Sequence, residues 1–149
     1  MKSIIIALAF LSGLTVNATT VAQVASVDAQ IAAVTLSDAG VLSVDLREGA
    51  KKTLKLSNTN KQNLLWAAQM LSESELEIEN RLVVCMMMIA PFSIQNLSVY
   101  DSKTKEMKIV LSSHSCAISS YTHPKESYQI EAAQVLKAEM LVLAHQLVK

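Results

Sequence analysis

The sequence predicts a single α+β domain, with a mainly antiparallel sheet of about six strands and two helices on one face, in the order βββαβββα. Apolar and polar residues alternate in several short segments, which is typical of half-buried strands. Two longer segments carry their apolar residues at helical spacing instead. Residues 19–149 are enough to build one hydrophobic core, so we expect one domain over this range.

The first 18 residues have the organisation of a secretory signal peptide. Lys2 provides a basic start, an apolar segment covers residues 4–16, and small residues precede a cleavage site after Ala18. An apolar segment of about a dozen residues is shorter than a membrane-spanning helix, and no later segment reaches the roughly 18 apolar residues that such a helix needs. We therefore expect an exported protein of the periplasm or the extracellular space, without a membrane span.

Alternating side chains predict three strands in the N-terminal half, over residues 30–37, 41–48 and 53–56. The first two are expected to form a hairpin through the Asp-Ala-Gly sequence at residues 38–40. The period changes at Ser57, where four residues that commonly cap helices open a helix that is predicted to end near Ser72.

On this helix, Leu64, Ala68 and Leu71 form the predicted core stripe, and Trp66 and Met70 lie off it. Trp66 and Met70 are four residues apart, so their side chains are neighbours on the helix surface. The sequence leaves two interpretations open: a second contact with the core, or an exposed anchor for a protein partner.

A fourth strand is predicted over residues 75–90. Glu75, Glu77 and Glu79 share one face of its first half, with apolar residues on the other face. Alternate residues of one strand are about 7 Å apart, so their carboxylates do not converge on a calcium ion, and the row is interpreted as a solvated strand face. From Leu82 onward the strand is apolar on both sides.

A second hairpin is predicted over residues 96–101 and 106–112. It resembles the first one, because Leu-Ser-Val occurs at residues 42–44 and again 55 positions later at residues 97–99. A weak internal duplication of a βββα unit would explain this similarity.

The last helix is predicted to begin at Pro124 or Ser127 and to continue almost to the end of the chain. Its predicted core row consists of Leu136, Met140, Leu143 and Leu147. His145 lies on the opposite side of this helix, so it is predicted to be solvated and not catalytic.

The sheet face away from the helices is predicted to be polar, with Ser43, Asp45, Thr53, Lys55, Ser98 and Lys108 on it. The apolar segment after Leu82 breaks this pattern. We predict an interaction surface formed by Val83, Met87, Ile89, Tyr100 and Val110, with Trp66 as a further candidate. Its cover could be the N-terminal segment 19–30, a second copy of the chain or another protein.

The two cysteines, Cys85 and Cys116, are predicted to form an intramolecular disulfide bond, because exported proteins fold in oxidising compartments. The alternative is a Cu(I) site. Cys85, Met87, His114 and Cys116 are soft or borderline ligands that strand alternation could bring to one face. A disulfide would remove both thiolates as metal ligands, so we expect neither a metal nor a cofactor.

No sequence motif specifies a reaction. The formal net charge is zero and there is no basic cluster, which argues against nucleic-acid binding. Only Gly40 and Gly49 follow the signal segment, so glycine-rich phosphate loops and the G-x-S-x-G nucleophile motif are absent. The sequence therefore favours an exported, non-catalytic binding or inhibitory protein with a protein partner or a homodimeric state. Alternatives are a hydrolase with a Ser/His/acid site scattered along the sequence and a Cu(I)-binding protein.

Overall fold

The computed structural model describes residues 18–25, 27–80, 95–112 and 120–149. In chain order, the elements within these ranges are β1 (Thr20–Ala25), β2 (Ile31–Ser37), β3 (Val41–Leu46), β4 (Lys51–Lys55), α1 (Asn58–Ser72), β5 (Leu76–Asn80), β6 (Asn96–Asp101), β7 (Glu106–Ser112), β8 (Ser120–Pro124) and α2 (Ser127–Val148). No helix in the described ranges is long and apolar enough to cross a membrane.

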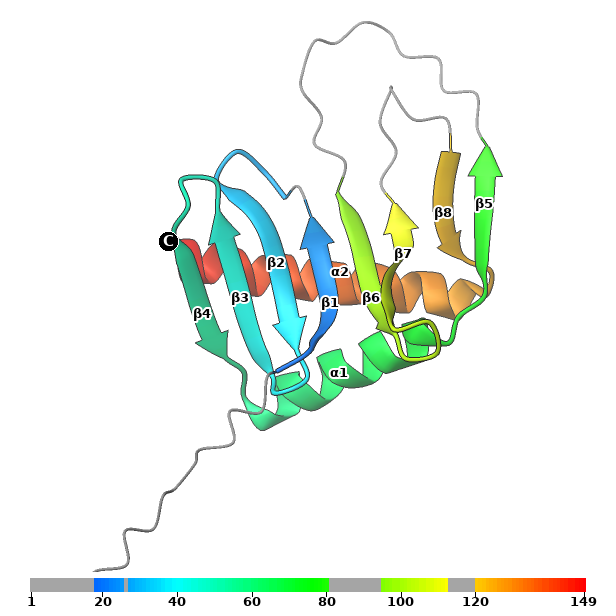
Figure 1. Cartoon of the computed structure of the whole chain (residues 1–149), viewed down its shortest axis with the longest axis horizontal. Helices are drawn as coiled ribbons and strands as arrows, with labels where there is room; N and C mark the ends of the chain where they lie inside the picture. The colour runs from blue at the N-terminus through cyan, green and yellow to red at the C-terminus, as the bar shows by residue number, and fades with distance from the viewer. Residues whose placement is uncertain (1–17, 26, 81–94, 113–119) are drawn as a thin grey trace, which may run out of the picture.

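The strands form a six-stranded antiparallel sheet in the order β4-β3-β2-β1-β6-β7 and a two-stranded sheet of β5 and β8 (Figure 1). The smaller sheet continues the layer beside β7, where the backbone N–H of Thr122 donates a hydrogen bond to Ser112 Oγ over 2.8 Å. Helix α2 crosses the strands on one side, and α1 runs antiparallel to it along one end of the strands. The α+β class and the six-stranded, mainly antiparallel sheet are therefore confirmed.

The N-terminal segment is a central strand of the sheet and not a cover for one face. Val24 of β1 pairs with Val34 of β2 on one side and with Leu97 of β6 on the other, and all three side chains are fully buried. The order in the described residues is thus ββββαββββα, with β1 and β8 added to the predicted strands. Large apolar and polar side chains alternate only weakly in β1, because the second inward-facing residue beside Val24 is the small Ala22.

In β7, the side chains before Leu111 point to the opposite sheet faces from those that the sequence predicts. Val110 was expected to point outward, but it is fully buried, whereas its neighbour Ile109 is 43% exposed. The cause is a β-bulge: Leu97 pairs with Leu111, and the next residue of β6 pairs with Ile109. One extra residue in a strand reverses the sheet face toward which each side chain before it points. Lys108 accordingly points to the helix side, where its Nζ donates a hydrogen bond to the backbone oxygen of Ser74 over 3.1 Å.

One hydrophobic core fills the space between the sheet and the helices. Its fully buried large side chains are Ile31, Leu36, Leu42, Leu71, Leu97, Leu136, Met140, Val24, Val34, Val44, Val99 and Val110. The core stripe predicted for α1 is confirmed, and Asn60 N–H donates to the Oγ of the N-cap residue Ser57 over 3.3 Å. On α2, Leu136 and Met140 are buried as predicted, whereas Leu143 and Leu147 are only partly buried.

The two hairpins with similar sequences, β3–β4 and β6–β7, lie at opposite ends of the six-stranded sheet. Helix α1 follows β4 directly, but β8 intervenes between β7 and α2. The order ββββα occurs twice, but the similar hairpins are the last two strands of the first half and the middle two of the second, so the internal duplication stays a prediction.

Candidate functional site

The candidate site is an apolar groove on the outside of the helix pair. It has a volume of about 480 Å³ and is lined by Asn63, Trp66, Ala67 and Met70 of α1 and by Tyr128, Glu131, Ala132 and Val135 of α2. These α1 residues lie on the face of the helix that adjoins the buried stripe of Leu64, Ala68 and Leu71. The same helical geometry that buries one stripe in the core thus presents the other stripe to solvent.

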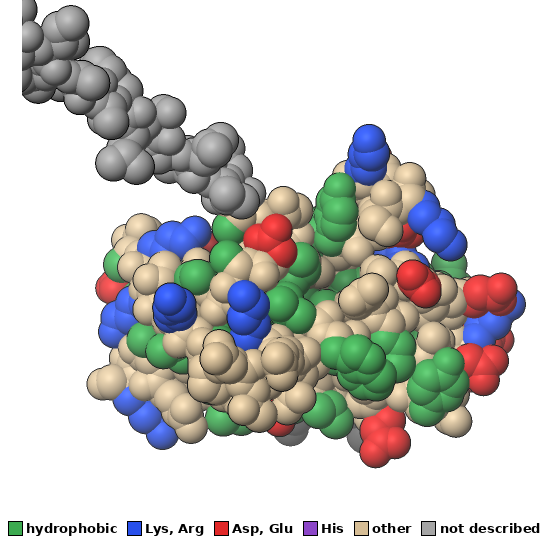
Figure 2. Space-filling model, turned by 90° about the horizontal axis from the view of Figure 1, so that it is seen from below, with side chains coloured by type: hydrophobic (Ala, Val, Ile, Leu, Met, Phe, Trp, Pro, Cys, Tyr) green, Lys and Arg blue, Asp and Glu red, His purple; other side chains and the backbone are tan. Residues whose placement is uncertain are grey.

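The groove is flanked by large apolar side chains that the protein leaves in water. Trp66 is 66% exposed, Tyr128 is 57% exposed and Val135 is 52% exposed. Ala67 and Ala132 lie between them, and their small side chains leave the hollow open. Figure 2 shows hydrophobic side chains gathered over this helix layer. Isolated exposed apolar residues are common, but an aromatic pair beside a shared apolar hollow is typical of a binding surface.

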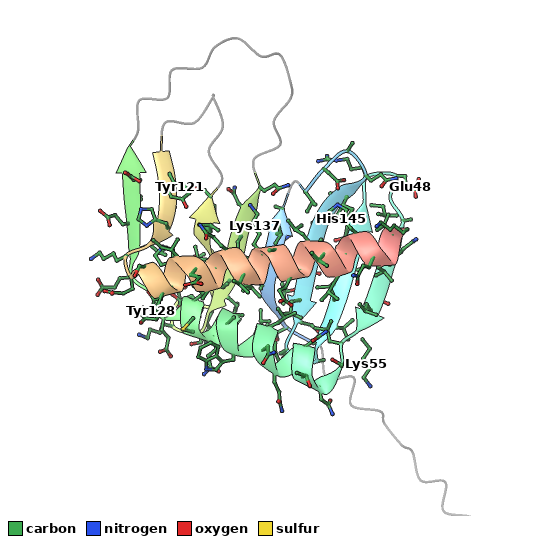
Figure 3. The ribbon with its side chains drawn as sticks, turned by 180° about the vertical axis from the view of Figure 1, so that it is seen from behind. Glu48, Lys55, Tyr121, Tyr128, Lys137 and His145 are labelled. Atoms are coloured by element: carbon green, nitrogen blue, oxygen red, sulfur yellow. The ribbon has the colours of Figure 1, made fainter. Side chains whose placement is uncertain are left out.

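The apolar surface continues along α2 beyond the groove. A second hollow is lined by Val135, Ala138, Glu139, Val142, Leu143 and Gln146, so the two hollows share Val135. Tyr128, Val135 and Val142 are seven residues apart, and Val142 is 56% exposed. Two helical turns separate such positions, so they form one seam. Figure 3 shows Tyr128 and His145 near the two ends of α2, between which the seam runs.

The charges and polar groups along the seam suit binding more than catalysis. Among the described residues, Glu131 is the only carboxylate that lines the first hollow, and Glu139 is the only one that lines the second. No histidine, cysteine or serine of the described ranges lines either hollow. A pair of groups for proton transfer or a nucleophile with its base is therefore missing from both linings.

The sequence-predicted interaction surface is only partly in the described residues. Trp66 is exposed and lies in the groove, as the anchor interpretation requires. Tyr100 is half-buried and lines a different hollow beside α1 with Asp38 and Ser72. Val110 is buried and cannot contribute to an exposed surface. Val83, Met87 and Ile89, with the disulfide and copper candidates Cys85, His114 and Cys116, lie outside the described residues.

His123 connects the two strands of the small sheet. Its Nε2 lies 3.9 Å from Glu79 Oε2, and its Nδ1 lies 2.7 Å from the backbone oxygen of Pro124. The Tyr121 ring lies beside it, with 5.1 Å between the ring centroids. In the part of the chain that the structure describes, no hydrogen bond joins His123 to a serine hydroxyl. The arrangement does not provide the Ser/His/acid geometry of the hydrolase alternative.

His145 is paired with an acid at the far end of α2. Its Nε2 lies 2.7 Å from Asp28 Oδ2, and its Nδ1 lies 2.7 Å from the backbone oxygen of Leu141. The hydrogen bond to Asp28 raises the pKa of His145, and the contact with Leu141 adds to this. Burial raises the pKa of Asp28, but hydrogen bonds from Ile31 N–H, His145 and Gln30 N–H bring it below its usual value. With acceptors at both ring nitrogens, the pair favours an imidazolium ion. Its surroundings are those of a structural link between α2 and the sheet.

No group of three or more His, Cys, Asp or Glu side chains among the described residues could hold a metal ion. Comparisons with known proteins add no functional information: no family of known proteins, no curated protein and no solved structure matches this chain. The site therefore has to be argued from its own geometry.

Sequence reasoning identified one half of the groove and missed the other. Trp66 and Met70 stood out because they lie off the core stripe of α1. Tyr128 and Val135 did not stand out, because α2 is apolar over much of its circumference and its core row was sought first. Their spacing of seven residues, repeated at Val142, was the available signal.

Proposed function

We propose that this protein is a small exported, non-catalytic binding or inhibitory protein, and that it holds an amphipathic helix of a partner protein in the groove between α1 and α2. The observation that carries the proposal is the exposed pair of Trp66 and Tyr128 beside a shared apolar hollow. Helix-in-groove recognition uses apolar anchors at helical spacing, which matches such a surface. Export by residues 1–18 and a Cys85–Cys116 disulfide are part of the same proposal.

The length of the seam supports a helix as the occupant. It extends along α2 from Tyr128 to Gln146, which corresponds to about 27 Å at the helical rise of 1.5 Å per residue. A partner helix of about 18 residues would cover this length. A single bound side chain or small molecule would leave most of the seam in water.

The charges on the seam indicate which kind of helix fits. Glu131 and Glu139 are the negatively charged residues along it, so lysine or arginine beside the apolar row of the partner would be complementary. A second copy of α2 fits less well. If two α2 helices crossed antiparallel about Val135, Glu131 of one copy would face Glu139 of the other, and like charges would repel.

Trp66 provides a direct test, because it is the only tryptophan of the chain. The probe is a tryptophan-free amphipathic peptide of about 18 residues made of Leu and Lys, titrated while Trp66 fluorescence is recorded. We expect a saturable blue shift, because binding removes the indole from water. An analogous peptide made of Leu and Glu should give little or no shift.

Variants place the binding on the seam. Val135→Glu should weaken binding of the Leu/Lys peptide by about tenfold or more, because a carboxylate would have to be desolvated in the groove. Ile109→Glu is the matched control, since it makes the same change at an exposed residue on another element. A blue shift that is equal for both peptides, or equal for both variants, would contradict the proposal.

A further inference from the structure

The two outermost strands of the described layer carry opposite charges. Strand β4 pairs only with β3, and β5 pairs only with β8, so in the described residues each has an edge without a strand partner. The exposed charged residues of β4 are Lys51, Lys52 and Lys55. The acidic residues in and just before β5 are Glu75, Glu77 and Glu79, and Glu75 Oε2 lies 2.8 Å from Lys125 Nζ of the same copy. Figure 2 shows most red side chains toward the β5 end, and blue ones at both ends.

The charged rows lie on the same side of the layer. In β4, Leu54 contacts the core and Lys52 Nζ donates a hydrogen bond to the backbone oxygen of Leu147 in α2 over 3.3 Å. Lys51 and Lys55 therefore point to the face away from the helices. Figure 3 shows Lys55 at this outer strand.

The same alternation applies to β5. Leu76 contacts the core, so Ile78 shares its side of the strand, and Glu75, Glu77 and Glu79 point to the face away from the helices. Ile78 is 66% exposed. An exposed β-branched residue in the middle of an unpaired edge strand is the kind of edge that natural proteins usually protect.

The strand directions also fit. All neighbouring strands run in opposite directions across the layer, so β4 and β5 point in opposite directions (Figure 1). If a second copy is placed beside the first without turning it over, its β4 runs antiparallel to β5 of the first copy. The core sides of both copies then lie on the same side of a continuous layer.

We propose that copies of this protein associate head to tail by strand addition, with β4 of one copy pairing antiparallel with β5 of the next. The register that matches facing and charge places Lys51 opposite Glu79 and Lys55 opposite Glu75. Ile78 then lies opposite Lys52, whose aliphatic stem covers it. Backbone hydrogen bonds provide the attraction, and the opposite charges fix register and order.

Two consequences follow from the geometry of this contact. Because it joins two different surfaces, each added copy leaves a free β4 edge and a free β5 edge, and the assembly does not close as a dimer. The contact is also small, since β4 and β5 have five residues each, so the association is weak and reversible. Exposed ion pairs are screened by salt, so high ionic strength should shift the equilibrium toward monomers.

Sedimentation velocity of the purified protein over a wide concentration range tests the proposal. We expect the average mass to rise with concentration without a plateau at two copies, and to fall when salt is added. Lys51→Glu/Lys55→Glu should weaken the association by about tenfold or more, because two attractive pairs become repulsive. Lys103→Glu/Lys105→Glu is the matched control, since it makes the same change in net charge at exposed residues of the β6–β7 turn, outside both edges.

Exchanging the charges of the two edges distinguishes the loss of a specific contact from the loss of folding. Glu75→Lys/Glu79→Lys should also be monomeric, because Lys51 and Lys55 of the next copy would then face two lysines. An equal mixture of this variant with Lys51→Glu/Lys55→Glu should assemble again, since every contact between unlike copies joins an acidic and a basic edge. A monomeric wild-type protein, a mass that stops at two copies, or association unchanged by Lys51→Glu/Lys55→Glu would overturn the proposal. Circular dichroism shows whether a variant is unfolded. If the variant of the β5 glutamates is unfolded, the comparison of Lys51→Glu/Lys55→Glu with its control tests the proposal.

Discussion

At the scale of single residues, hydrogen bonds and ion pairs say more about how this protein is held together than sequence motifs do. His145 was predicted to be solvated, and its side chain is 48% exposed. The contact of His145 with Asp28 could not be predicted from the sequence, because 117 positions separate the two residues and only the fold brings them together. A contact between distant residues depends on tertiary structure, so local periodicity cannot predict it.

The His145–Asp28 pair should make stability depend on pH. Its hydrogen bond to Asp28 holds the pKa of His145 above the usual value of about 6.5. Because the folded pKa is raised, the stabilisation is complete below the unfolded pKa and is lost as pH rises through the folded value. We expect His145→Gln to lower the melting temperature at about pH 5.5 and to have little effect at about pH 9.

Asp28→Asn is the matched control for this pair. The amide oxygen can still accept the N–H groups of Gln30 and Ile31, but the charge that stabilises the imidazolium is removed. His145→Gln in the Asp28→Asn background should therefore show little pH dependence. A destabilisation that grows toward alkaline pH would show that the pair is not held by the imidazolium charge.

The disulfide between Cys85 and Cys116 also belongs to this scale. It stays a prediction, because both cysteines lie outside the described residues. Closing a loop of about 31 residues should stabilise the protein by roughly 3 to 4 kcal/mol in the chain-entropy model. We expect the mass of the unreduced protein after thiol alkylation to show no modified cysteine. Two alkylated cysteines would contradict the prediction.

At the scale of elements, prediction succeeded where one period persists and failed where it is interrupted. Helix α1 was predicted to within one residue because Ser57 caps it and a core stripe runs through it. The predicted directions of the β7 side chains were wrong because a bulge inserts one residue into the strand. An alternating sequence does not indicate where such a shift occurs. Strand β1 was missed because alanine gives little contrast between its two faces.

The bulge in β7 predicts an unusual order of mutational effects. Val110→Ala should lower the free energy of unfolding by about 2 kcal/mol, because the side chain is fully buried. Ile109→Ala removes more atoms, yet it should cost less than about 1 kcal/mol because Ile109 is 43% exposed. Chemical denaturation of the two variants provides the measurement. A larger loss for Ile109 would mean that β7 alternates without the bulge.

Helix α2 predicts a similar gradient along its core row. Leu136 is fully buried, so Leu136→Ala should cost about 2 to 5 kcal/mol. Leu143 is only partly buried and borders the exposed seam, so Leu143→Ala should cost clearly less. Equal losses at the two positions would show that the C-terminal half of α2 is covered as deeply as its centre.

At the scale of the whole molecule, a formal net charge of zero conceals a difference in charge between the two outermost strands, basic β4 and acidic β5. Composition excluded a uniformly basic nucleic-acid surface, but it could not reveal this difference, which depends on the order of strands in the layer. The groove and the charged edges lie on different elements, so binding in the groove and head-to-tail association can be tested separately.

The start of the ordered fold gives a last prediction at this scale, about signal processing. Strand β1 begins at Thr20, two positions after the predicted cleavage site. The backbone nitrogen of Thr19 lies 3.0 Å from Asp38 Oδ1, and Asp38 N–H donates to the oxygen of Thr19 over 2.9 Å. Cleavage after Ala18 would turn this nitrogen into an ammonium group, and a charged donor strengthens a hydrogen bond to a carboxylate.

We therefore expect the exported protein to have the intact mass of residues 19–149. Asp38→Asn should destabilise this processed chain by about 0.5 to 1 kcal/mol, since it removes the charge that faces the ammonium group. The comparison is a chain that starts at Asn17, in which Thr19 keeps an uncharged amide nitrogen and Asp38→Asn should cost less. A mass that corresponds to another first residue would contradict the predicted cleavage site. An equal effect of Asp38→Asn in both chains would show that Asp38 stabilises the turn and not the new N-terminus.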